Sequence, residues 1–261
     1  MKVGLIQLNA GTDKATNIIR ARSLVQKAVE AGAEFILLPE VFNYRGPLSG
    51  GELYHQIAEE IPGKSIIPFI EMAKKNAVHI LAGSIYERKL GGEKIYNTSV
   101  MIDDSGDIIG KYRKINLFKA VIDGQKIDES ETYEHGKEPV LCGIENKKIG
   151  LSICFDLRFP ELYRNYFKEK VDLIVIPSSF SQKTGELHWK PLLRARAIEN
   201  YCYVLAPNQF GIDGNGVETY GNSMVIDPQG RVIATLEKKR EDILIVDLIF
   251  KERVFYPTVQ A

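Results

Sequence analysis

Residues 148–161 read Lys-Ile-Gly-Leu-Ser-Ile-Cys-Phe-Asp-Leu-Arg-Phe-Pro-Glu, and two features of this segment indicate the fold of the whole chain. The apolar run ends at Cys154, and polar and charged residues follow at once, which is typical of a buried strand that ends in a turn. The first four residues also repeat the order Lys, apolar, Gly, Leu of residues 2–5. An opening strand of the chain is therefore expected to occur again near its middle.

Three further matches follow in the same order along the chain. They are Leu37-Leu38-Pro39 with Val175-Ile176-Pro177, Leu81-Ala82 with Leu205-Ala206, and residues 99–103 with residues 223–227. Residues 13–31 have the apolar spacing of an amphipathic helix, whereas the all-apolar run 35–38 needs cover on both faces of its strand. We predict two pseudo-equivalent α/β halves with helices outside two sheets, forming one domain over residues 1–261. The charged stretch 119–139 is predicted to be a long loop.

Composition excludes several classes of protein. The 34 Lys and Arg residues balance 34 Asp and Glu residues, so the basic surplus of a nucleic-acid-binding protein is missing. No apolar run approaches the roughly 20 residues of a membrane span, and the N-terminus has no signal-peptide pattern. The odd, scattered cysteines Cys142, Cys154 and Cys202 favour a reducing, cytoplasmic location. The four histidines lack metal-ligand spacing, so we expect no zinc site.

Three residues, apart from the matching segments above, are candidates for a catalytic role. Cys154 lies where backbone amides of a following turn lower a thiol pKa, although a buried structural cysteine is the alternative. Glu40 directly follows the strand 35–38 at the carboxyl edge of a sheet, where α/β proteins place their sites; a helix cap or solvated acid is the alternative. Lys114 belongs to the basic cluster 110–118, which is either a solvated face or, because an apolar run follows, a partly buried amine.

A thiol, a carboxylate and an ammonium together can hydrolyse an amide. The carboxylate accepts the thiol proton and later activates water, the sulfur attacks the carbonyl carbon, and the ammonium stabilises the oxyanion. The sequence has no Gly-x-Ser-x-Gly elbow, no phosphate-binding loop and no dinucleotide fingerprint that would favour another chemistry.

Three motifs occur in the order of a known family. Leu38-Pro39-Glu40, Tyr112-Arg113-Lys114-x-x-Leu117-Phe118 and Cys154-Phe155-Asp156-x-Arg158-Phe159-Pro160-Glu161 resemble the glutamate, lysine and cysteine motifs of the nitrilase superfamily of carbon–nitrogen hydrolases. The resemblance covers nearly the whole chain. It implies a four-layer α-β-β-α sandwich that forms a homodimer or higher homo-oligomer through its helices and uses no metal or organic cofactor.

The resemblance also implies roles for individual residues. Cys154 would be the nucleophile, Glu40 the general base and Lys114 the partner of the oxyanion. The backbone amide of Phe155 would complete the oxyanion hole. Glu129 resembles a further acid that orients the lysine and the substrate, and its neighbour Glu131 is the alternative for this role.

Two more features concern the substrate. Ser179 and Phe180 follow the strand 173–176 at the place that Glu40 occupies in the first half, so we predict that they face the pocket. Arg158 either forms a structural ion pair with Glu161 or binds a substrate carboxylate.

The sequence around Cys154 is similar to that of the Nit-type amidases, which include ω-amidase and deaminated-glutathione amidase. Asn116 and Asn222 stand where this subgroup commonly has histidine, and the change removes titration near neutral pH. We predict a thiol amidase acting on a small carboxylate-bearing amide. Alternatives are a nitrilase, an N-carbamoyl-amine hydrolase, or a non-catalytic binding subunit of the same fold.

Overall fold

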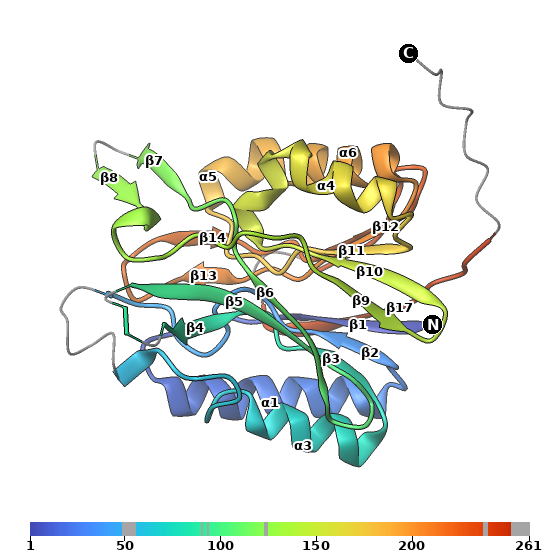
Figure 1. The fold of residues 1–261 in the computed structure, drawn as a ribbon, viewed down its shortest axis with the longest axis horizontal. Helices are drawn as coiled ribbons and strands as arrows, with labels where there is room; N and C mark the ends of the chain where they lie inside the picture. Colours follow the sequence, from blue (N-terminus) through green and yellow to red (C-terminus); the bar gives the residue numbers. More distant parts are fainter. Residues whose placement is uncertain (49–55, 90, 93, 123–124, 237–239, 252–261) are drawn as a thin grey trace.

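The computed structural model of the chain describes residues 1–48, 56–89, 91–92, 94–122, 125–236 and 240–251. Helices α1 (Lys14–Glu30) and α3 (Ile67–Asn76) form one outer layer, and α4 (Pro160–Lys168) and α6 (Lys190–Asn200) form the other. Two sheets lie between these layers (Figure 1). The predicted α-β-β-α sandwich is confirmed.

The first sheet has the strand order β17-β1-β2-β3-β5-β4, and β6 pairs with β5. Its strands are β1 (Lys2–Gln7), β2 (Phe35–Leu37), β3 (His79–Leu81), β4 (Ile85–Arg88), β5 (Ile95–Ile102), β6 (Ile108–Arg113) and β17 (Asp242–Asp247). Strands β1, β2 and β3 are parallel, and β5 runs antiparallel to β3.

The second sheet repeats this arrangement with the order β16-β15-β12-β11-β10-β9. Its strands are β9 (Leu141–Ile144), β10 (Lys147–Leu151), β11 (Leu173–Val175), β12 (Tyr203–Ala206), β15 (Met224–Ile226) and β16 (Val232–Thr235). The matching sequence segments fall on equivalent strands: β1 with β10, β2 with β11, β3 with β12 and β5 with β15. The two predicted halves are therefore present as two sheets of the same internal order.

Alternation along the strands explains why both faces of each sheet are apolar. In β2, Phe35 and Leu37 belong to the core between the sheets, whereas Ile36 packs in the core under α1 and α3. Asp13 caps α1 by accepting hydrogen bonds from the N–H groups of Ala15 and Thr16.

The stretch 119–139 differs from the prediction of a long loop. It contains a hairpin of β7 (Lys119–Ile122) and β8 (Gln125–Asp128), followed by a 3-10 turn over Glu129–Glu131. The β-branched residues of this stretch favour strands, and the charged residues around them obscured that signal. A second small hairpin joins β13 (Phe210–Ile212) and β14 (Glu218–Tyr220).

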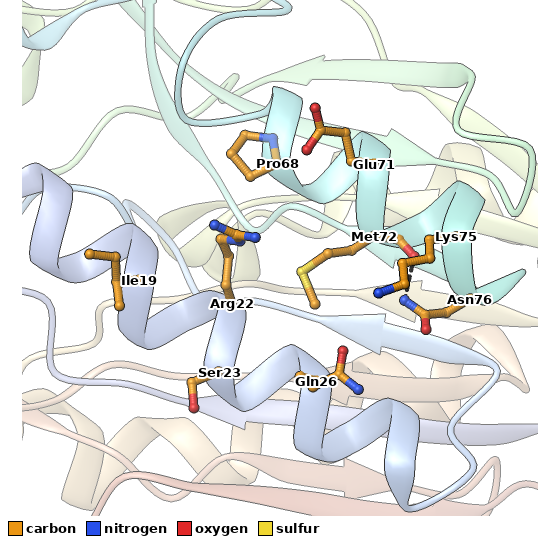
Figure 2. Close-up of a pocket in the computed structure, with 9 residues that line it drawn as sticks. All are labelled: Ile19, Arg22, Ser23, Gln26, Pro68, Glu71, Met72, Lys75 and Asn76. Carbon is orange, nitrogen blue, oxygen red and sulfur yellow. Dashed lines mark hydrogen bonds between the residues drawn. The ribbon is translucent and has the colours of Figure 1, made fainter.

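Helices α1 and α3 leave a shallow groove of about 400 Å³ on the outer surface (Figure 2). Residues from both helices line it, and none of the site residues predicted from the sequence is among them. Among the described residues, no helix combines the length and apolar character that a membrane crossing requires.

Candidate active site

All seven site residues predicted from the sequence line one pocket of about 480 Å³: Glu40, Lys114, Glu129, Cys154, Phe155, Ser179 and Phe180. This volume falls within the roughly 300–1,000 Å³ that is usual for small-molecule sites. Lys114 directly follows β6, and Glu40 and Ser179 lie three and four residues after the ends of β2 and β11. The pocket therefore forms where strand ends from both halves meet.

Lys114 is the central cation of this pocket, with only 1 % of its side chain exposed. Its Nζ donates to Oε1 of Glu40 at 3.0 Å and to both carboxylate oxygens of Glu129 at 3.1 and 3.0 Å. Burial alone would lower the pKa of Lys114, but Glu129 and Glu40 outweigh it and hold the pKa well above its usual value. Lys114 is therefore a fixed positive charge.

Glu40 lies between the lysine and the thiol. Besides Lys114, its Oε1 accepts a hydrogen bond from Nδ2 of Asn97 at 2.9 Å, and its Oε2 accepts one from the backbone N–H of Ser179 at 2.8 Å. The Cys154 thiol lies close enough to this carboxylate for the two groups to interact and for Glu40 to raise the pKa of the thiol. Because its other partners are all donors, Glu40 is held as an acceptor and is placed to receive the thiol proton.

Cys154 begins a short 3-10 helix, Cys154–Arg158, directly after the second-half strand β10 and its two following residues. Its φ of +44° is rare for a residue with a side chain, and such conformations concentrate at functional sites. Its backbone N–H donates to the carbonyl of Pro177 at 3.0 Å, which fixes the turn to the end of β11. The thiol is thereby directed into the pocket, where only 9 % of the residue is exposed.

The lowered thiol pKa expected from the sequence is wrong. Burial and the neighbouring Glu40 raise the pKa of Cys154 well above its ordinary value, and Lys114 only partly opposes them. The resting side chain is therefore a protonated thiol. A base must remove its proton when the sulfur reacts, and Glu40 is in contact with it.

Glu129, rather than its sequence neighbour Glu131, contacts the lysine. Its carboxylate also accepts a hydrogen bond from the backbone N–H of Phe118 at 2.7 Å. Burial raises the pKa of Glu129, and Lys114 opposes that rise. Glu131 is exposed and does not line the pocket.

Aromatic side chains form the wall beside the thiol. The Phe155 ring meets Phe118 edge to face at 5.1 Å, and Phe180 packs against Trp189 at 5.1 Å. The N–H of Phe180 donates to Oδ1 of Asn208 at 3.0 Å, which fixes the segment after β11. These contacts give the pocket an apolar wall beside the thiol.

The sequence comparison agrees with this geometry. The model of the carbon–nitrogen hydrolase family matches residues 2–254. The chain belongs to the carbon–nitrogen hydrolase family.

Named relatives lie within the same family. This carbon–nitrogen hydrolase is 39% identical over 258 residues to deaminated glutathione amidase of Dictyostelium discoideum, covering 95% of this chain and 87% of that protein. It is 36% identical over 252 residues to omega-amidase NIT2 of Mus musculus, covering 96% of this chain and 89% of that protein.

Two solved structures share the fold. The NitFhit protein of C. elegans has a TM-score of 0.85 and 32% identity over 94% of this chain, which spans 60% of the NitFhit chain. Nit3 of Saccharomyces cerevisiae, a nitrilase-superfamily member, has a TM-score of 0.83 and 30% identity, covering 94% of this chain and 89% of that chain. The resemblance to the nitrilase superfamily is thus confirmed.

Arg158 of this hydrolase does not form the structural pair considered from the sequence. Within the described part of the chain no ion pair joins it to Glu161, and its guanidinium instead lies over the rings of Phe155 and Phe180, at 5.6 and 5.1 Å. One of its nitrogens is 3.2 Å from Nδ1 of His188. The guanidinium therefore remains available to the pocket, which it lines.

Sequence reasoning missed Asn97, a polar partner of Glu40 in the pocket. Asn97 lies inside β5, and a buried polar side chain in an apolar strand indicates a hydrogen-bond partner nearby.

The two asparagines singled out in the sequence lie outside the pocket lining. Asn116 donates to Asp156, and Asn222 donates to the carbonyl of Tyr220. Neither asparagine lines the pocket. In the described ranges, no three His, Cys, Asp or Glu side chains are grouped to hold a metal ion.

Proposed function

We propose that this carbon–nitrogen hydrolase is a thiol amidase that acts on a small carboxylate-bearing amide, such as a 2-oxo acid ω-amide or deaminated glutathione. The observation that carries the proposal is the Glu40 carboxylate, which contacts both the Lys114 ammonium and the Cys154 thiol in one pocket. Both curated relatives named above are amidases, which supports the same bond class.

The first half of the reaction forms a thioester. Glu40 accepts the proton of the Cys154 thiol as the sulfur bonds to the amide carbon. The oxyanion that forms is stabilised by the Lys114 ammonium and by the backbone N–H of Phe155. When the C–N bond breaks, the nitrogen takes the proton from Glu40 and leaves as ammonia or an amine.

The second half releases the acid. Glu40 accepts a proton from water as the water oxygen attacks the thioester carbon, and Lys114 again stabilises the oxyanion. The C–S bond then breaks, and the sulfur recovers its proton from Glu40. Amide and water are converted to carboxylic acid and ammonia or an amine, and the enzyme returns to its starting state. Glu129 keeps Lys114 in place throughout.

The charges of the pocket support a substrate that carries a carboxylate. Lys114 is already paired with carboxylates, and Arg45 lies 3.9 Å from Asp213. Among the described residues, no carboxylate pairs with Arg158, which faces aromatic rings and a histidine. A substrate carboxylate would supply the missing negative charge.

The decisive experiment replaces Cys154 with Ala and measures ammonia release from a panel of ω-amides, nitriles and N-carbamoyl amines. The variant should be inactive and folded, and the wild type should prefer ω-amides. Preference for nitriles or carbamoyl amines would replace the amidase assignment by one of those alternatives. Full activity of the Cys154→Ala variant would reject the thiol mechanism. A wild type that binds these ligands but turns none of them over would also reject it, in favour of a binding subunit. Mass spectrometry of the acylated Cys154 names the acyl group.

We further propose a single-domain, cytoplasmic homodimer without cofactor, nucleic-acid or membrane partners, in which the layer of α4 and α6 forms the interface. Ile198 in α6 and Leu187 just before it are exposed by 46% and 71%, and exposed large apolar side chains mark contact surfaces. Light scattering of an Ile198→Glu variant tests the interface: a shift from dimer to monomer is expected, and an unchanged mass contradicts it.

A further inference from the structure

Asp156 has a carboxylate with four hydrogen bonds next to the pocket, although it does not line the pocket. The residue is completely buried and lies two positions after Cys154. Its Oδ2 accepts hydrogen bonds from the hydroxyl of Tyr112 at 2.7 Å and the backbone N–H of Ile153 at 2.9 Å. Its Oδ1 accepts from the backbone N–H of Asn116 at 2.8 Å and from Nδ2 of the same residue at 2.9 Å.

These partners come from both halves of the molecule. Tyr112 and Asn116 stand two residues before and two residues after Lys114, at the end of β6 in the first half. Ile153 directly precedes Cys154 in the second half. One side chain therefore joins the segment that carries the ammonium to the turn that carries the thiol.

The bonds act on the backbone that holds the reacting groups. The Ile153 contact closes the turn in which Cys154 takes its left-handed φ of +44°. The Tyr112 and Asn116 contacts hold the chain on either side of Lys114, whose own N–H donates to the carbonyl of Asn97 at 2.9 Å. Burial raises the pKa of Asp156, and the hydrogen bonds from Tyr112, Ile153 and Asn116 oppose that rise. The two backbone N–H groups and the Asn116 amide can only donate, so these contacts favour the carboxylate form.

We propose that Asp156, Tyr112 and Asn116 form a positioning unit that sets the distance between the Cys154 sulfur and the Lys114 ammonium. The inference rests on the proposed function, because it assumes that these two groups act on one carbonyl. Asp156 makes no contact with the reacting atoms and acts through the two backbone segments. A displacement of about 1 Å in such a site lowers the rate by roughly 100-fold.

The test uses variants that keep the shape of the core. Asp156→Asn replaces one acceptor oxygen by an NH₂ group, so at least one donor loses its partner, and kcat should fall by about 100-fold with little change in KM. Tyr112→Phe and Asn116→Ala each remove one donor and should give smaller losses, near tenfold. Tyr166→Phe is the matched control: it removes a buried hydroxyl of the same core that donates to the carbonyl of Leu151, outside the unit.

The readouts separate positioning from stability. The kcat per folded active site, KM and the urea midpoint are measured for each variant. Tyr166→Phe is expected to lower the urea midpoint and keep kcat. If Tyr112→Phe and Asn116→Ala give the same result, the positioning unit is rejected. These two variants decide the question even where Asp156→Asn does not fold. Retained turnover of Cys154→Ala would instead reject the proposed function, so the two failures are distinguishable.

Discussion

The Nζ atom of Lys114 lies 3.0 Å from Oε2 of Glu129 in the wall of the pocket, where the lysine is buried and the glutamate half-buried. Together with Glu40, the lysine therefore has two carboxylate neighbours, so the cluster carries a net negative charge before any thiolate forms. Burial of the thiol comes first and the charge of Glu40 second in raising the pKa of Cys154, and Lys114 only partly opposes them, so the thiol stays protonated at rest. Glu129 is a carboxylate that holds the lysine and does not itself contact the thiol.

Replacing Glu129 with Gln should reduce kcat and leave the fold intact. The amide removes one of the two charges that hold the Lys114 ammonium, so we expect a loss of roughly 10- to 100-fold in kcat for an interaction of about 1.5–3 kcal/mol. Glu131→Gln makes the same change two positions further on, at an exposed residue outside the pocket, and should keep wild-type kinetics. Equal effects of the two substitutions would show that the assignment of Glu129 is wrong.

Replacing Lys114 with Met should affect stability as well as activity. The buried carboxylates of Glu40 and Glu129 would lose their shared cation, and such unpaired charges cost about 3–5 kcal/mol. Urea unfolding should show this loss, and ammonia release should fall close to background. The double variant with Lys114→Met and Glu129→Gln should recover part of the stability that Lys114→Met loses, but none of the activity. If the double variant is no more stable than Lys114→Met, the charge argument fails.

The raised pKa of the Cys154 thiol predicts the pH dependence of its alkylation by iodoacetamide. Because the folded-state pKa lies well above the usual 9.0, the thiolate fraction at neutral pH is small. The rate should rise about tenfold per pH unit through the range below that value, without a plateau. Glu40→Gln removes a charge that raises this pKa, so alkylation should become faster in this variant while amide turnover is lost. A wild-type plateau below about pH 8 would contradict the raised pKa.

The sequence predicted the residues of the site better than their electrostatics. Glu40 and Cys154 follow short apolar runs, and Lys114 lies in a basic cluster that an apolar run follows, so these local patterns and the family motifs around them locate the three residues without coordinates. The thiol pKa was predicted in the wrong direction, because it depends on burial and on a carboxylate that arrives from the other half. Asp156 was overlooked for a related reason, since Tyr112 and Asn116 lie 44 and 40 positions away.

Gly83→Ala should destabilise the turn that carries Glu40. A Cβ at Gly83 would lie 1.9 Å from the carbonyl oxygen of Pro39, and φ there is +29°. Overpacking of about 1–3 kcal/mol adds to a backbone cost of about 1–2 kcal/mol. Gly216→Ala, with φ of +78° and open space around it, carries only the backbone cost. Urea unfolding compares the two, and equal losses would show that the contact with Pro39 is relieved without strain.

Arg158→Met should weaken the binding of carboxylate-bearing amides while the chemistry continues. Methionine keeps the apolar contact with Phe155 and Phe180 but removes the guanidinium, and a hydrogen bond to a charged group is worth about 1.5–3 kcal/mol. We expect KM to rise by roughly 10- to 100-fold for such a substrate, with kcat at saturation nearly unchanged. An amide of the same length without a carboxylate should show no change in KM.

The matched control for this prediction is Arg164→Met, the same substitution at an exposed position of α4. It removes one positive charge from the surface without altering the pocket, so KM should stay at the wild-type value for both substrates. If Arg158→Met raises KM equally for the charged and the neutral amide, the guanidinium shapes the pocket through packing. The carboxylate requirement would then have to be assigned to another residue, and Arg45, the pocket's other arginine, is the first to be tested.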